Sequence, residues 1–221
     1  MQYFFLALDW SEVWALVIPL SVLLFRRQPA SLRPVIIYVW LAFLINIIID
    51  VIMEINAYFP RLTNNPFYNI HSVIRFACFS FYFIHLQKKS FSRIKQWLAI
   101  LAAAFILINF IFFENFFNPE SFSGNLFTVE AYLLLVYCIL YYLTELKTDD
   151  DLFNGPHFWV VTGLAIYVVT NFFVFLFYTP MRQVNGKLAD QMWDVHNVAF
   201  IIFCLFITKA FYGPLRYQYS V

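Results

Sequence analysis

Long apolar runs alternate with short polar connectors along almost the whole chain. A helix needs about 20 apolar residues to cross the hydrocarbon core of a bilayer. Seven runs approach this length and predict spans at residues 11–25, 34–57, 66–87, 95–115, 125–146, 156–178 and 190–212. The connectors, such as PRLTNNP and NPESFSGN, are short and rich in turn formers, and they leave no room for a separate soluble domain. The pattern predicts a single all-α domain over residues 1–221, a seven-transmembrane-helix bundle.

Composition supports a membrane protein. Of the 221 residues, 62% are hydrophobic and 12% are charged, which is more apolar surface than a soluble domain of this size can bury. The net charge of +1 gives no basic excess for binding nucleic acid. Cys78, Cys138 and Cys204 lie in apolar runs, so we expect them to pack in the core rather than form disulfides or bind zinc. The N-terminal residues lack the basic start of a cleaved signal peptide, so we expect them in the mature protein.

Lysine and arginine residues predict the orientation of the bundle. Arg75 lies inside a predicted span, and the others fall unequally on the two sides of the membrane. One side carries Arg26, Arg27, Arg33, Lys88, Lys89, Arg93, Lys95, Lys147, Lys209 and Arg216, and the other carries Arg61, Arg182 and Lys187. Because basic loops stay in the cytoplasm, we expect the N-terminus outside and the C-terminus in the cytoplasm.

A short internal repeat suggests how the spans are organised. The third predicted span begins with NIHSV (69–73) and the seventh with DVHNV (194–198), and both motifs lie at predicted outer ends. This is compatible with two parallel three-helix units joined by the fourth span, the 3+1+3 plan of SWEET-type carriers. The alternative is chance similarity between two apolar helices.

Ionisable and amide side chains interrupt the apolar runs at similar depths, mostly in the predicted outer third of the bilayer. A charge at the bilayer centre costs about 2.5–3.5 kcal/mol on insertion scales, so these groups should face one another, the bundle interior or water. We expect one outward-facing pocket for a small ligand, metal or proton, formed by Asp50, Glu54, His71, Arg75, Glu130, Asn171, Asp194, His196 and Asn197. Arg75 would neutralise Asp50 or Glu130. The alternative is a hydrogen-bond network that only holds the helices together.

Metal binding is a further hypothesis for the same region. His71, His196, Glu130 and Asp194 are residue types that bind zinc or another divalent metal, and they lie at similar predicted depth. No His-x-x-x-His or His-Glu-x-x-His pairing accompanies them. The bundle requires no cofactor by itself. Pairs such as His71–Ser72 are similar to those of seven-span ceramidase-like hydrolases, whose third zinc histidine has no counterpart on the last span here.

Three functions fit these patterns. The first is a non-enzymatic sensor or receptor-like protein, embedded in the lipid bilayer, with a signalling partner at the basic cytoplasmic loops. The second is a small proton-coupled carrier for a cationic or zwitterionic solute, which uses the carboxylates as proton or substrate sites. The third is a metal-dependent intramembrane hydrolase.

Two segments carry a resemblance to a known group. NNPFYNIHSVIRFACFSFYF and FWVVTGLAIYVVTNFFVF, followed by WDVHNV, resemble uncharacterised seven-helix membrane proteins of Bacteroidota-type bacteria, some encoded near sensor kinases. The resemblance implies a bacterial inner membrane and a sensory role. That group commonly has an acid four residues after the histidine of the third span, where this chain has Arg75.

Overall fold

The computed structural model describes residues 7–56, 63–86, 91–117, 123–145 and 155–213, and this part of the chain is helical with no strand. The helices are α2 (Ser11–Phe25), α3 (Arg33–Asn56), α4 (Asn65–Leu86), α5 (Ser92–Ile108), α6 (Gly124–Glu145), α7 (Pro156–Val184) and α8 (Gly186–Tyr212). A 3-10 turn, η1 (Ala30–Leu32), precedes α3, and a π-helical segment, η2 (Asn109–Phe113), continues α5. Each apolar run identified in the sequence overlaps one of these seven helices.

Five of the described helices are long and apolar enough to cross a membrane. They are α3 with η1, α5 with η2, α6, α7 and α8. The other two helices, α2 and α4, do not meet this criterion, for separate reasons. Helix α2 is apolar but has only 15 residues, or about 22 Å at 1.5 Å per residue. Helix α4 has 22 residues, but polar side chains that include His71 and Arg75 interrupt its apolar sequence.

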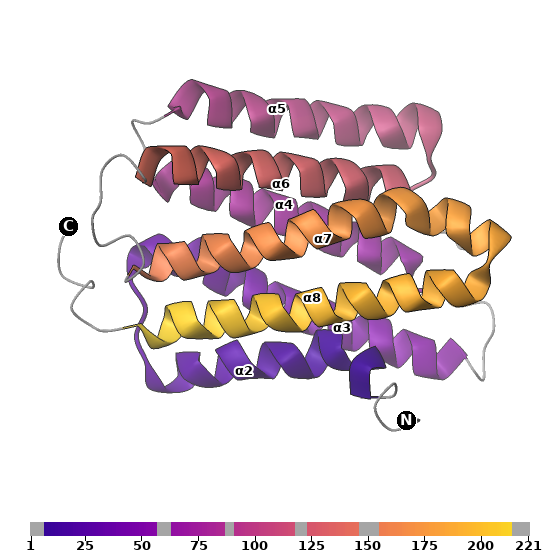
Figure 1. Cartoon of the computed structure of the whole chain (residues 1–221), viewed down its shortest axis with the longest axis horizontal. Coiled ribbons are helices and arrows are strands. Elements are labelled where there is room, and N and C mark those ends of the chain that lie inside the picture. The colour runs from indigo at the N-terminus through magenta and orange to yellow at the C-terminus, as the bar shows by residue number, and fades with distance from the viewer. Residues whose placement is uncertain (1–6, 57–62, 87–90, 118–122, 146–154, 214–221) are drawn as a thin grey trace.

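The helices form a ring with one helix outside it. Around the ring, α2 packs on α3, α3 on α4, α4 on α6, α6 on α7, α7 on α8, and α8 again on α2. Helix α5 lies outside, against α4 and α6 (Figure 1). Successive helices run in opposite directions, so α2, α4, α6 and α8 all begin at the end where α7 meets α8, at the right of Figure 1. This end is called the α7–α8 end below.

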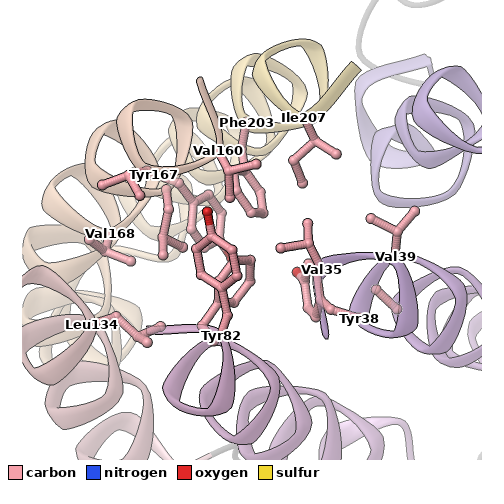
Figure 2. Close-up of a cluster of buried hydrophobic side chains, with 14 of the residues drawn as sticks. Val35, Tyr38, Val39, Tyr82, Leu134, Val160, Tyr167, Val168, Phe203 and Ile207 are labelled. Carbon is pink, nitrogen blue, oxygen red and sulfur yellow. The ribbon is translucent and has the colours of Figure 1, made fainter. Parts of the chain in front are cut away.

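Apolar side chains fill the interior of the ring on the side away from the α7–α8 end. They come from α3, α4, α6, α7 and α8 and point toward one another (Figure 2). The labelled residues are Val35, Tyr38, Val39, Tyr82, Leu134, Val160, Tyr167, Val168, Phe203 and Ile207, each at most 1% exposed. The Tyr167 and Phe203 rings stack with centroids 5.2 Å apart. This part of the ring is a packed core.

Helices α7 and α8 approach each other closely at Gly163. A Cβ atom added there would overlap the Cβ and ring of Phe206 on α8. Glycine lets two helix backbones approach closely, as small residues commonly do between membrane helices. The turn between the helices is held by Asn185, whose side chain accepts a hydrogen bond from the Leu188 amide at 3.2 Å. An asparagine in this position satisfies one of the free amides at the start of a helix.

Candidate functional site

An arginine–carboxylate pair is buried between α4 and α6. Arg75 Nε donates to Glu130 Oε1 at 2.5 Å, and Arg75 Nη2 donates to Glu130 Oε2 at 2.7 Å. Ser72 Oγ donates to the same carboxylate, and Arg75 Nη1 donates to the Tyr167 hydroxyl at 2.6 Å. Two parallel bonds between a guanidinium and a carboxylate are among the strong hydrogen bonds of proteins. Glu130 is therefore the partner of Arg75, one of the two that the sequence suggested.

A second buried cluster centres on His196 in α8. His196 Nε2 lies 2.9 Å from Glu12 Oε1 on α2, and His196 Nδ1 lies 2.5 Å from Asn171 Oδ1 on α7. The rings of Trp193 and Phe175 pack against the imidazole, with centroids 5.0 and 5.3 Å away. His196 is 3% exposed and Glu12 is 4% exposed. The imidazole thus joins three helices away from water.

Hydrogen bonding determines where the His196 proton lies. Asn171 Nδ2 donates to the Tyr167 carbonyl at 2.8 Å, which turns Asn171 Oδ1 toward the imidazole. Because Oδ1 can only accept, His196 Nδ1 must carry a hydrogen. His196 Nε2 then either donates to an ionised Glu12 or accepts from a protonated Glu12. In both forms a single proton lies between the two side chains, and the pair has no net charge.

The two clusters join at Tyr167. Its hydroxyl accepts from Arg75, and its carbonyl accepts from Asn171, which bonds to His196. The result is a continuous set of contacts across α2, α4, α6, α7 and α8. We call it the buried polar network, and it consists of Glu12, Ser72, Arg75, Glu130, Tyr167, Asn171 and His196.

Two pockets open at the α7–α8 end, with volumes of about 690 Å³ and 260 Å³. Their walls share Asp9, Met53, Tyr68 and Trp193, so they are described together as the vestibule. Its acidic wall residues are Asp9, Asp50, Glu54, Asp190 and Asp194, and its aromatic ones are Trp10, Tyr68, Tyr178 and Trp193. Partial burial raises the pKa of the Asp9 carboxyl above its ordinary value.

The vestibule touches the buried polar network at two places. The Tyr68 hydroxyl, in the vestibule wall, donates to Glu12 Oε2 at 3.5 Å. Trp193 lines the vestibule and packs on His196. Both contacts reach the Glu12–His196 pair, so that pair lies directly beneath the vestibule.

The nine residues that the sequence assigned to one pocket fall into two groups. Asp50, Glu54 and Asp194 line the vestibule. The remaining six are buried: His71, Arg75, Glu130, Asn171, His196 and Asn197. The nine residues therefore do not line one pocket. The six buried residues lie between packed helices, where side chains fill the space.

The four residues of the metal hypothesis have separate surroundings. Glu130 is engaged by Arg75 and Ser72, His196 by Glu12 and Asn171, and Asp194 lies in the vestibule wall. The four suggested ligands are thus not brought together. In the described part of the chain, no group of three His, Cys, Asp or Glu side chains is placed to hold a metal ion.

Two of the buried residues make no hydrogen bond to the buried polar network within the described ranges. His71 Nε2 lies 3.5 Å from the Tyr38 hydroxyl, and the two rings are stacked. Asn197 is fully buried, and neither its Nδ2 nor its Oδ1 has a partner within the described ranges. The paired histidine motifs thus have different surroundings on α4 and α8.

Sequence reasoning missed Glu12, Tyr167 and Tyr68 as members of the site. Glu12 stands at the start of the first apolar run, where an acid can reach interfacial water, so its position does not by itself indicate a buried site. An acid one position inside an apolar helix was the available signal. Tyr167 and Tyr68 gave none, because a tyrosine in an apolar helix usually packs in the core.

A further polar cluster at the α7–α8 end is structural. Asn109 Nδ2 donates to Glu114 Oε2 at 2.7 Å, and Ser123 Oγ donates to the same carboxylate. The Ser123 amide donates to Asn69 Oδ1 at 3.1 Å. These contacts tie the end of η2 to the starts of α4 and α6, apart from the vestibule.

Comparisons of the chain with protein-family models, with curated proteins and with solved structures found no match. The bacterial membrane and the sensory role that the sequence resemblance implies therefore stay predictions.

Proposed function

We propose that the chain is a seven-span sensor or receptor-like protein of a bacterial inner membrane, which binds a small ligand or a proton at its outer end. The five long apolar helices support an integral membrane protein. Helices α2 and α4 support seven spans because they complete the same ring as four of those helices. Described basic residues lie opposite the α7–α8 end, which favours a vestibule that faces outward; they are Arg26, Arg27, Arg33, Arg93, Lys95 and Lys209.

The observation that carries the proposal is the contact between the vestibule and the buried polar network. Tyr68 and Trp193 belong to the vestibule wall and touch Glu12 and His196. From this pair, bonds continue through Asn171 to Tyr167 and Arg75 in the interior. A change of charge beneath the vestibule therefore acts on bonds between five helices.

The expected trigger is one added proton at the Glu12–His196 pair. Both forms described above are neutral and share one proton between the two side chains, so one more proton would leave a cationic imidazole beside a neutral carboxyl. The titratable groups around His196 are Glu12 on α2, Asp50 on α3, Tyr68 and His71 on α4, and Tyr167 on α7. Because burying an uncompensated charge is costly, the helices that hold the pair would shift toward an arrangement that hydrates it.

The packed core favours a sensor over the carrier alternative. A carrier needs a path between its site and the opposite side of the membrane. Below the network, Tyr38, Tyr82 and Phe203 meet inside the ring and are at most 1% exposed (Figure 2). A sensor needs movement of the helices but no such path. The metal-dependent hydrolase is the least supported alternative, because the described residues supply no ligand set.

The test measures movement at the cytoplasmic end when the outer end is acidified. Phe25, at the end of α2 opposite the vestibule, is 86% exposed. It is replaced by cysteine and labelled with bimane, whose emission reports its surroundings. On lowering the pH from 8 to 5 in detergent micelles, we expect an emission shift that His196→Gln and Glu12→Gln abolish.

Glu114→Gln is the matched control, because Glu114 is a carboxylate of the separate cluster at the same end. It should keep the full response. The proposal fails if the native protein gives no shift, or if the shift survives in both network variants.

A further inference from the structure

The vestibule combines acidic and aromatic side chains from different parts of the chain. Its carboxylates come from Asp9, which precedes α2, from α3 and from α8, and its aromatic rings come from Trp10, α4, α7 and α8. The cationic wall residue in the described part of the chain is Arg182. Arg182 lies 3.4 Å from Asp190 in an exposed salt bridge, which already uses one acid. The other four carboxylates have no cation beside them among the described wall residues.

Asp50 is the member that points most directly to a ligand. It lies 7% exposed in the wall of the smaller pocket, and its Oδ2 has no hydrogen-bond partner among the described residues. A buried carboxylate oxygen without a partner is costly, and side chains in folded proteins rarely leave it so. The Arg75 and His196 side chains cannot supply the missing partner, because Glu130 and Glu12 occupy them.

We infer that the vestibule binds an organic ammonium cation, held by Asp50 and the aromatic wall; this rests on the proposed function, since it names the ligand of the same site. The space is too large for the shell of one metal ion, whose ligands lie about 2.0–2.6 Å from it. Volumes of about 690 Å³ and 260 Å³ match a small organic molecule. Aromatic faces attract weakly hydrated organic cations, and carboxylates attract their charge.

The position of such a ligand in the vestibule explains how its charge would influence the buried polar network. A cation beside Asp50 and Tyr68 lies next to Glu12, because Tyr68 donates to that carboxylate. Positive charge there favours the ionised form of Glu12. Ligand and proton would therefore act in opposite directions on the Glu12–His196 pair.

The test compares each cation with an uncharged molecule of the same shape. Choline is paired with 3,3-dimethylbutan-1-ol, and butane-1,4-diamine with butane-1,4-diol. Isothermal titration calorimetry is done on the full chain in dodecylmaltoside, whose headgroup carries no ammonium. We expect at least one cation to bind ten or more times tighter than its neutral partner.

Two variants locate the binding, each with a matched control. Asp50→Asn should weaken the cation at least tenfold, whereas Glu114→Gln, outside the vestibule, should change it less than twofold. Trp10→Leu at the rim should weaken it at least threefold, whereas Trp97→Leu, 61% exposed on α5, should not. Trp10→Leu keeps the test open if Asp50→Asn does not fold.

The inference is overturned if neither cation binds better than its neutral partner, or if both vestibule variants bind like the native protein. These results are separable from the acid response of the bimane label. Loss of cation binding with an intact acid response rejects only the ligand class. Cation binding that depends on Asp50, without any acid response, rejects the coupling and leaves the binding site.

Discussion

Arg75 and Glu130 neutralise each other inside the bundle, where each is at most 4% exposed. The carboxylate also accepts from Ser72, and the guanidinium also donates to Tyr167. Both Glu130 oxygens and all three Arg75 side-chain nitrogens therefore have hydrogen-bond partners. Such a pair costs desolvation energy to bury, and its net contribution to stability is small. Removal of one member is strongly destabilising, because it leaves the other charge buried without a counter-ion.

Glu130→Gln should therefore be strongly destabilising, by about 3–5 kcal/mol, since Arg75 keeps its charge and loses its counter-ion. The double variant Arg75→Met with Glu130→Leu should recover most of that loss, because no buried charge remains. Both are measured by titrating sodium dodecyl sulfate into micelles of the purified protein and following helicity. A Glu130→Gln protein within about 1 kcal/mol of the native one would show that Arg75 finds water or another acid.

At the level of the helices, α7 and α8 approach each other closely at one small residue, Gly163. Gly163 on α7 faces Phe206 on α8, and the overlapping atom is a Cβ fixed to the backbone. A larger residue therefore cannot be accommodated by turning the end of a flexible side chain. The two helices carry Asn171 and His196, so their spacing also sets the geometry of the network.

Gly163→Ala should destabilise the bundle by about 1–3 kcal/mol, the usual cost of overpacking. Gly186→Ala at the start of α8 is the matched control, because an added Cβ there meets nothing within 4 Å. We expect the control to match the native protein in the same detergent titration. Equal stability of the two variants would mean that α7 and α8 separate easily at this crossing.

The histidine motifs of α4 and α8 bear on the repeat. Both helices begin at the α7–α8 end, and the units α2–α4 and α6–α8 form the two halves of the ring with α5 outside. This arrangement is compatible with the 3+1+3 plan. The histidines themselves differ, since His71 meets Tyr38 whereas His196 meets Glu12 and Asn171. If α2–α4 and α6–α8 are repeats, they therefore share the arrangement of their helices more than the partners of their histidines.

The whole molecule has two unlike ends. The α7–α8 end carries the acidic vestibule, and the opposite end carries basic residues that include Arg26, Arg27 and Arg93. Helix α5 and the η2 segment that continues it add an apolar outer surface, where Trp97, Leu101 and Ile111 are more than half exposed. Such a surface is consistent with an integral membrane protein, as are the five helices that are long and apolar enough to cross a membrane.

Cysteine labelling tests the orientation of the molecule. Gln183→Cys lies in the vestibule wall, and Ser92→Cys lies at the opposite end, where α5 begins. In intact bacterial cells whose outer membrane is permeabilised, a membrane-impermeant maleimide should label the first variant and reach the second only after lysis. The native protein is the control, since Cys138 and Cys204 are buried and Cys78 is partly buried. The reverse pattern would invert the proposed orientation.

The sequence alone determined the helical class and the positions of the apolar segments. It could do so because the apolar length of a helix and the cost of a charge in lipid depend on local residues and a fixed rise. Which side chains meet was decided by the tertiary structure. Helix rotation and neighbour choice come from packing, so Arg75 met Glu130, and His196 met Glu12, 184 residues away. The same packing separated the vestibule from the network, which depth alone had merged.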